Sequence, residues 1–178
     1  HIAQLTGAQA ACVTTGAAAG IAISVAAVLA GTNPARVRAL PQVTGIRAVA
    51  LQAGHAVNFG AEVVQMIRMA GGDPKVVGSA NAVSPELLAA TLAGGEFAAY
   101  VHVLSHHCVQ ENMTSFTDAL AICKHHNIPM IVDAAAEQDL NSYIAAGADL
   151  VTYSGGKAIA GPTSGFIAQG RALTPPKI

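Results

Sequence analysis

Charged and aromatic residues are both scarce in this sequence. Of its 178 residues, 11% are charged and 4% are aromatic, with no tryptophan, whereas 52% are hydrophobic and the formal net charge is −1. So apolar a chain can build a core, and its length suits one domain. It lacks the cluster of lysines and arginines with which proteins capture nucleic acids, so we expect no nucleic-acid partner.

Cysteines are few and are not spaced as metal ligands. Cys12, Cys108 and Cys123 are odd in number, which indicates a reducing compartment, and we therefore expect a cytoplasmic protein. His106 and His107 precede Cys108 directly, but adjacent histidines cannot easily bind one ion and no second cluster completes four ligands. We expect no metal.

The first 35 residues contain no charge after His1. Residues 2–35 are long enough to cross a bilayer, yet they consist mostly of alanine, glycine, threonine and serine. Gly16, Gly20 and Gly31 interrupt them, and the strongest apolar run, residues 21–30, is short. A buried helix packed on a sheet is the better prediction, and we expect no membrane partner.

Two common nucleotide-binding fingerprints are missing. The sequence contains no GxGxxG, and Val151 stands where a Walker motif ending in Lys157 would need glycine. Neither NAD nor ATP is therefore indicated.

A strand that ends near a lysine is the most informative stretch of the chain. Residues 150–153 are apolar and β-branched, and they run into Ser154 and two glycines before Lys157. Small apolar neighbours offer this lysine no partner. Desolvation favours the neutral amine that attacks a carbonyl, so the position suits Schiff-base chemistry. A surface lysine on a flexible glycine loop is the alternative.

The strand before it ends in an acid. Residues 128–136 are apolar up to Asp133, which lies 24 positions before Lys157, and a helical segment at residues 140–146 fits between them. One such crossover places two parallel strands side by side, about 4.8 Å apart. An amine and a carboxylate would then lie about the span of a small aromatic ring apart. Pyridoxal phosphate needs this pair, a lysine for its aldehyde and a carboxylate for its ring nitrogen.

These residues carry a resemblance to a known group of enzymes. The run IVDAAAEQDLNSYIAAGADLVTYSGGKAIAGPTSGFIAQG resembles the cofactor core of fold-type I pyridoxal-phosphate enzymes. It most resembles the branch that includes selenocysteine synthase (seryl-tRNA selenium transferase) and the D-glucosaminate-6-phosphate ammonia-lyases. The stretches LTGAQAACVTTGAAAGIAISVAAVLAG, QAGHAVNFGAEVVQMIRMAGG and LSHHCVQENMTSF favour the ammonia-lyase side.

The fold we predict is a three-layer α/β/α domain with a mainly parallel sheet, like the large domain of aspartate aminotransferase. The resemblance implies that residues 1–178 are this cofactor domain and that the flanking small-domain segments are absent. It also implies that residues 164–168 return as an antiparallel strand after the lysine. Further strands are expected at 48–51, 75–77 and 98–104, helices at 58–69 and 115–126 and from residue 84, and a short connection at 37–41.

The resemblance implies a phosphate site at the start of the first long helix. Residues 12–17 should form the turn into this helix, where hydroxyls and free N–H groups bind anions. The implied phosphate ligands are Thr14, Thr15, Gly16 and Ala17. Ser154 is a further one. Ordinary capping of the helix by a threonine is the alternative reading.

Other positions are implied to surround the cofactor ring. His55 would stack on one face of the pyridine ring, although a histidine after a strand is more often an exposed turn residue. Ala135 would leave room on the opposite face. In the polar loop after residue 104, Ser105 would contact the cofactor. His106 is a candidate general acid or base, and Gln110 a candidate substrate ligand.

The implied activity is that of a lyase acting on an amino acid. Lys157 would take the α-proton and Asp133 would keep the cofactor ring electron-withdrawing. The substrate would lose a β-substituent and then ammonia to give a 2-oxo acid, with D-glucosaminate 6-phosphate as the best named substrate. Aldol cleavage, C–S lysis, selenium transfer and a noncatalytic binding module stay open as alternatives. Fold-type I resemblance also implies a homodimer or higher homo-oligomer.

Overall fold

A seven-stranded mixed sheet forms the centre of the protein in the computed structural model, which describes residues 1–109 and 111–173. The strand order is β1-β9-β8-β7-β5-β2-β3, and only β9 runs antiparallel to its neighbours. The strands span β1 Ala10–Thr14, β2 Ala48–Gln52, β3 Asp73–Val77, β5 Ala99–Val103, β7 Met130–Asp133, β8 Leu150–Ser154 and β9 Gly165–Gln169. The antiparallel return after the lysine is thus confirmed. Two short strands, β4 Ala82–Val83 and β6 Asn112–Met113, pair separately.

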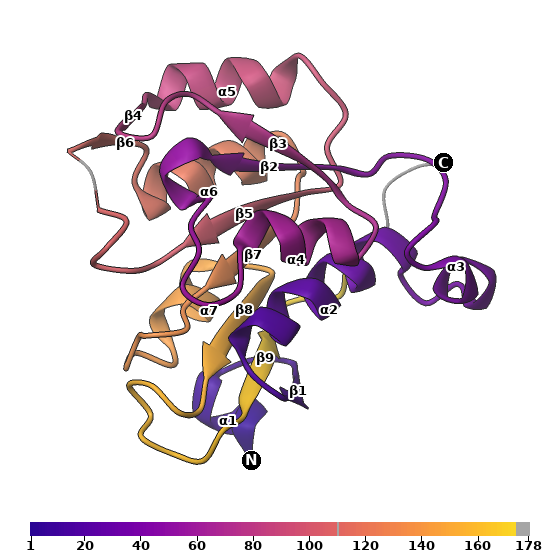
Figure 1. Cartoon of the computed structure of the whole chain (residues 1–178), viewed down its shortest axis with the longest axis vertical. Coiled ribbons are helices and arrows are strands. Elements are labelled where there is room, and N and C mark those ends of the chain that lie inside the picture. Colours follow the sequence, from indigo (N-terminus) through magenta and orange to yellow (C-terminus); the bar gives the residue numbers. More distant parts are fainter. Residues whose placement is uncertain (110, 174–178) are drawn as a thin grey trace.

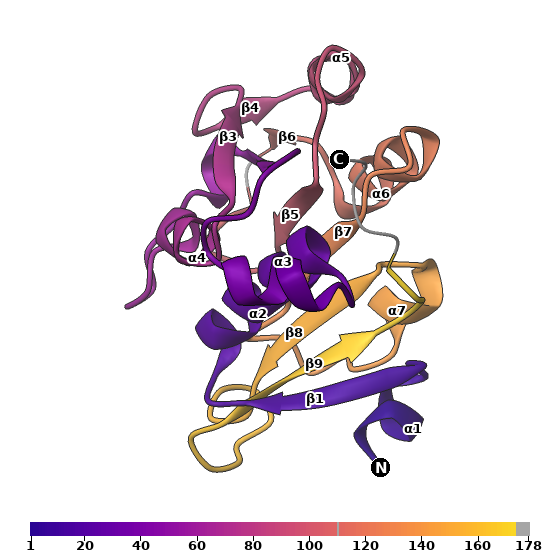
Figure 2. The same ribbon diagram turned by 90° about the vertical axis from the view of Figure 1, so that its right-hand side faces the viewer.

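Helices cover both faces of this sheet, as Figures 1 and 2 show. In Figure 2, α2 and α4 lie on one side of the twisted sheet and α6 and α7 on the other. The helices span α1 Ile2–Thr6, α2 Ala17–Ala30, α3 Pro34–Ala39, α4 Val63–Met69, α5 Pro85–Ala93, α6 Phe116–His125 and α7 Ser142–Ala146, with a 3-10 turn at Ala53–His55. The three-layer prediction is confirmed.

Each face of the sheet has its own apolar core. On one face Val25 and Leu29 of α2 pack with alternate sheet residues such as Val101. On the other face Leu88 and Leu120 belong to a second cluster, built from the remaining strand positions. Every residue of β5 and β7 is buried, as expected for parallel strands covered on both sides.

Helix α2 lies unusually close to β8 because of one glycine. A methyl group at Gly20 would collide with the side chain of Thr152. The Thr152 hydroxyl donates to the carbonyl oxygen of Ala17 at 3.3 Å. This contact fixes the start of α2 over the carboxyl end of β8.

Several local predictions were wrong. Residues 10–14 form an edge strand and not the approach to a helix, and residues 34–39 form α3 where a connection was expected. Helix α4 begins at Val63, five residues later than predicted. Gly60 has φ +103°, and its N–H donates to the Asn58 side chain, so the chain turns here before the helix starts.

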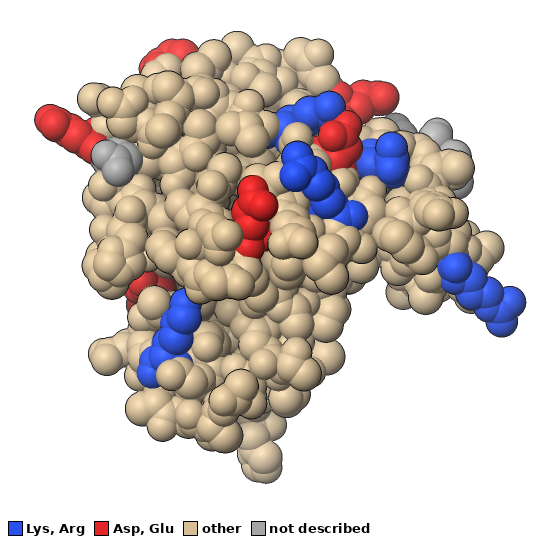
Figure 3. All heavy atoms as spheres, viewed as in Figure 1, with Lys and Arg blue, Asp and Glu red and all other residues tan. Residues whose placement is uncertain are grey.

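On the face drawn in Figure 3, several basic and acidic side chains lie close together towards the upper right, and the acidic ones interrupt the basic ones. Among the described residues, no helix combines the length and apolar character needed to cross a membrane.

Candidate active site

The carboxyl ends of β7 and β8 meet at one edge of the sheet, as the sequence predicted. The two strands pair in parallel with Asp133 opposite Thr152. Asp133 is the last residue of β7, and Lys157 follows the end of β8 by three residues. The acid and the amine therefore belong to neighbouring strands.

Asp133 is buried, with only 7% of its surface exposed. Burial raises the pKa of its carboxyl to about 6, although the N–H of Ala135 and the positive charge of Lys157 lower it. The Ala135 N–H donates to Oδ1 of Asp133 at 3.1 Å. Lys157 is near enough to influence Asp133, yet the described residues include no ion pair between them.

Lys157 is exposed, which corrects the expectation of a desolvated lysine. The loop after β8 closes on itself: the Gly155 N–H donates to Ser164 and the Gly161 N–H to Gly155. These two hydrogen bonds join the ends of the loop that carries Lys157. Its Nζ lies 5.9 Å from the ring centroid of Phe59.

The N-terminus of α2 lies at the same edge and has no side-chain cap. Gly16 is the N-cap residue, and the Thr14 hydroxyl donates instead to the Gly16 carbonyl oxygen at 3.0 Å. The alternative of threonine capping is therefore wrong. The first N–H groups of a 14-residue helix remain open, a favourable place for an anion.

Strand pairing explains why this helix start is close to β8. Thr14 pairs with Gly165, and Gly165 pairs with Ser154. A side chain at position 165 would collide with the backbone of Gly16, so the close approach requires glycine there. Thr15 is exposed, Gly16 and Ser154 are half-buried, and Ala17 is buried.

His55 is buried and is not an exposed turn residue. Its Nδ1 accepts a hydrogen bond from the Val103 N–H at 3.2 Å, and its ring meets that of His102 edge-on at 4.5 Å. Burial lowers the pKa of His55 to about 4 and that of His102 to about 3, so both imidazoles are neutral near pH 7. Sequence reasoning missed His102, because a histidine inside an apolar strand gave no signal of a site.

The loop after β5 supplies polar groups to this edge. Ser105 Oγ accepts a hydrogen bond from the His107 N–H at 3.3 Å, and the rings of His106 and His107 lie 3.7 Å apart. Cys108 is buried, and both this burial and the charge of Asp133 raise the pKa of its thiol. Gln110 lies outside the described residues.

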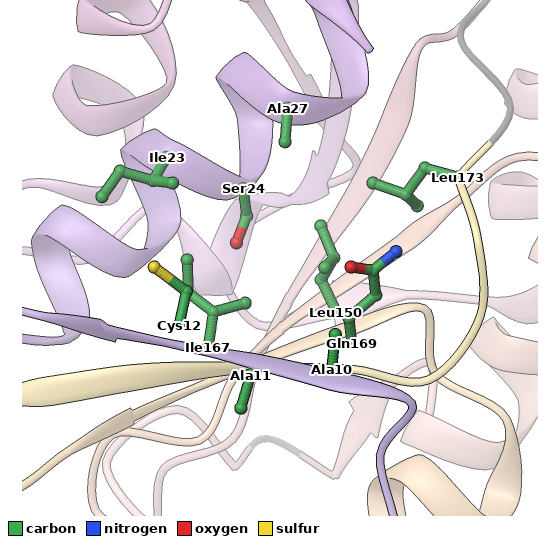
Figure 4. Close-up of a pocket in the computed structure, with 10 residues that line it drawn as sticks. All are labelled: Ala10, Ala11, Cys12, Ile23, Ser24, Ala27, Leu150, Ile167, Gln169 and Leu173. Carbon is green, nitrogen blue, oxygen red and sulfur yellow. The ribbon is translucent and has the colours of Figure 1, made fainter. Parts of the chain in front are cut away.

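Two cavities differ in their position relative to this edge. One of about 260 Å³ is lined by residues that include His55, His102, Ser105 and Cys108, and it adjoins the candidate site. The other, of about 170 Å³, lies between α2 and strands β1, β8 and β9 (Figure 4). Leu150 and Gln169 line this second cavity at the amino end of β8, far from Lys157 along the strand.

The structure brings the described residues that were predicted for the site to one edge. Ala135, Ser154 and Ser105 follow or end the strands that carry Asp133, Lys157 and His106. Phe59, which falls in the helix predicted at residues 58–69, also lies near Lys157. Among residues 1–109 and 111–173, no group of three histidine, cysteine, aspartate or glutamate side chains could hold a metal ion.

The mainly parallel α/β fold of this chain is also found in solved structures of pyridoxal-phosphate enzymes. The structure of serine palmitoyltransferase with pyridoxal phosphate superposes with a TM-score of 0.66 at 17% identity, covering 96% of this chain and 40% of that one. No protein-family model matches the chain.

Closer similarity links the chain to particular enzymes. The structure of D-glucosaminate-6-phosphate ammonia-lyase superposes with a TM-score of 0.88 at 42% identity, over 94% of this chain and 46% of that chain. The chain is 43% identical over 167 residues to the D-glucosaminate-6-phosphate ammonia lyase of Salmonella typhimurium, which covers 93% of this chain and 45% of the relative. The resemblance stated from the motifs is thus confirmed.

Two other relatives carry different names. The chain is 43% identical over 169 residues to a 5'-C-glycyluridine monooxygenase-decarboxylase of a Streptomyces species, over 93% of this chain and 42% of the relative. It is 24% identical over 196 residues to the L-seryl-tRNA(Sec) selenium transferase of Geotalea uraniireducens, over 98% of this chain and 38% of the relative. The chain therefore spans less than half the length of each of these curated relatives.

Proposed function

We propose that this chain is the cofactor domain of a pyridoxal-phosphate-dependent ammonia-lyase. The observation that carries the proposal is that Asp133 ends β7 and Lys157 follows the paired strand β8 by three residues, beside the uncapped N-terminus of α2. The similarity to D-glucosaminate-6-phosphate ammonia lyase supports the same class of reaction.

The residues present fit the cofactor. Lys157 offers an exposed amine for the aldehyde, and Asp133 offers a buried acid for the ring nitrogen. The open N–H groups at the start of α2, with Thr15 and Ser154 nearby, suit the phosphate. His55 and the small Ala135 are our candidates for the two faces of the ring. When bound, the cofactor supplies an electron-withdrawing ring that stabilises negative charge on the substrate α-carbon.

Each residue then has a defined task. Lys157 would hold the cofactor through its aldehyde, and its free amine would be placed to take the proton from the substrate α-carbon. Asp133, with a pKa of about 6, is ionised above that pH, and its negative charge would favour a proton on the cofactor ring nitrogen. His106 is the candidate that donates a proton to the departing β-hydroxyl group.

We propose an amino-sugar acid phosphate such as D-glucosaminate 6-phosphate as substrate. Removal of the α-proton and loss of the β-hydroxyl as water leave an enamine, which rearranges to an imine. The imine takes up water and releases ammonia. The water lost in the first step is regained in the second, so the net products are a 2-oxo acid and ammonia.

A second candidate function rests on the Streptomyces relative, which is as similar as the ammonia lyase. An oxygen-dependent decarboxylation on the same cofactor would consume dioxygen and release carbon dioxide, whereas the lyase would do neither. Aldol cleavage would instead release an aldehyde, and C–S lysis a thiol. Seryl-tRNA would be the substrate of selenium transfer, for which the sequence shows no basic cluster.

The cofactor assignment can be tested before any substrate is known. Protein mixed with pyridoxal phosphate should turn yellow, and borohydride should fix the cofactor to the peptide that contains Lys157. Lys157→Ala should give no such adduct, while Lys75→Ala, at an exposed lysine on β3, should leave it intact. A colourless protein that ignores the cofactor would refute the proposal and favour a noncatalytic binding module.

We further propose that residues 1–178 are the large domain of a longer cytoplasmic enzyme that forms a homodimer or higher homo-oligomer. The share of its relatives that the chain spans supports the first point. Exposed apolar side chains support assembly, since Val13 of β1 is 69% and Ile23 of α2 46% exposed. Light scattering gives the state of assembly directly.

A further inference from the structure

Two adjacent exposed imidazoles, those of His106 and His107, lie at the carboxyl edge of the sheet. Their ring centroids are 3.7 Å apart. Neither ring forms a hydrogen bond with any side chain that the structure describes, and only the backbone N–H of His107 is engaged, by Ser105. Their ring nitrogens are therefore available to a ligand.

Phe59 lies close both to His107 and to Lys157. It lies in the segment of residues 56–62, which follows β2, whereas Lys157 follows β8. The Phe59 ring centroid is 5.8 Å from that of His107 and 5.9 Å from Nζ of Lys157. An apolar ring that is 49% exposed thus lies near both the reactive amine and the imidazole of His107.

We propose that Phe59, His106 and His107 form a subsite for the anionic tail of the substrate. The inference rests on the proposed function and names what the enzyme recognises beyond the amino group. The carbon chain that leads away from Lys157 would pack on the face of Phe59, and a terminal phosphate would accept a hydrogen bond from the imidazole N–H of His107, with the ring of His106 beside it. His107 makes the main contact.

A titration with inorganic phosphate tests the subsite without cofactor or turnover. The imidazole signals of His106 and His107 in NMR spectra should shift saturably as phosphate is added near pH 7. His125 and His126 provide a matched control, since their rings are also adjacent, 4.9 Å apart, at the other end of the sheet. No shift, or equal shifts in both pairs, would overturn the proposal.

Kinetics with two substrates separate the subsite from the function as a whole. His107→Asn should lower kcat/KM for D-glucosaminate 6-phosphate by about tenfold or more, because it removes a hydrogen bond to a charged group. The kcat/KM for D-glucosaminate, which lacks the phosphate, should not change. The yellow absorbance of the bound cofactor should not change either. His125→Asn should alter neither substrate.

The possible failures differ. Equal loss of kcat/KM for both substrates in His107→Asn, or no loss for either, would refute the tail subsite while the lyase assignment stands. Absence of cofactor binding in the parent protein would instead refute the proposed function. The phosphate titration would still decide whether the imidazoles bind an anion.

Discussion

Replacing Asp133 with asparagine should stabilise the cofactor-free protein at neutral pH. Burial raises the pKa of Asp133 from 3.8 to about 6, so the folded chain holds a proton there after the unfolded chain has released it. The folded state binds more protons in this window, and stability therefore falls as the pH rises from about 4 to about 6. At about 1.4 kcal/mol per pKa unit, the loss is about 3 kcal/mol, and it persists above pH 6.

The substitution is conservative in shape and in hydrogen bonding. An asparagine side-chain oxygen can still accept the bond that the Ala135 N–H donates to Asp133, but it has no charge to desolvate. Urea unfolding at several pH values gives the free energy of unfolding for both proteins. The difference between variant and parent should grow by about 3 kcal/mol from pH 4 to pH 7.

Adding pyridoxal phosphate should change which of the two proteins has the larger free energy of unfolding. The parent should gain stability from the ligand by mass action, whereas Asp133→Asn should gain little. Glu96→Gln, at an exposed carboxylate, controls for the loss of one negative charge. A stability difference that does not vary with pH would show that burial does not raise the pKa of the Asp133 carboxyl in the folded protein.

Three further substitutions test other parts of the structure. His55→Gln should reduce acid denaturation, because burial lowers the pKa of His55 from 6.5 to about 4. The parent protein therefore loses stability as the pH falls from 6.5 to about 4. At about 1.4 kcal/mol per pKa unit, this loss is about 3 kcal/mol. Unchanged acid sensitivity in urea melts would contradict this. Gly20→Ala should destabilise the protein by about 1–3 kcal/mol, because its methyl group meets Thr152, and an unaltered Tm would mean that α2 is not so close to β8. Ser24→Ala should raise the free energy of unfolding by about 1 kcal/mol, since the buried Ser24 hydroxyl has no hydrogen-bond partner among the described residues; a loss of stability would point to a partner there.

The sequence predicted the central strands well because their side chains are unambiguous. Short apolar runs that end in Asp133 or run towards Lys157 favour buried strands of a parallel sheet, and their pairing follows from the single crossover between them. The sequence did not predict β1, since Ala10 and its neighbours have the same small apolar character as the helix that follows.

Other predictions from the sequence failed because the environment of a residue depends on segments that are distant in the chain. Phe59 has helical spacing with Val63, but the positive φ of Gly60 ends that pattern in the folded chain. The exposure of Lys157 depends on which segments cover it in space, not on the small residues beside it in sequence. His55 was expected in the site, yet its burial against His102 could be known only from the fold.

Thr14, Gly165 and Ser154 stand in one row, on three strands that come from the two halves of the chain. An anion held at the start of α2 would touch the first of these halves, and an adduct on Lys157 would fasten the second. One small molecule would then bind both halves of the chain and stabilise the edge strand β1 on the sheet. Binding of the cofactor should therefore slow amide hydrogen exchange in β1 much more than in β3, the strand at the other edge of the sheet.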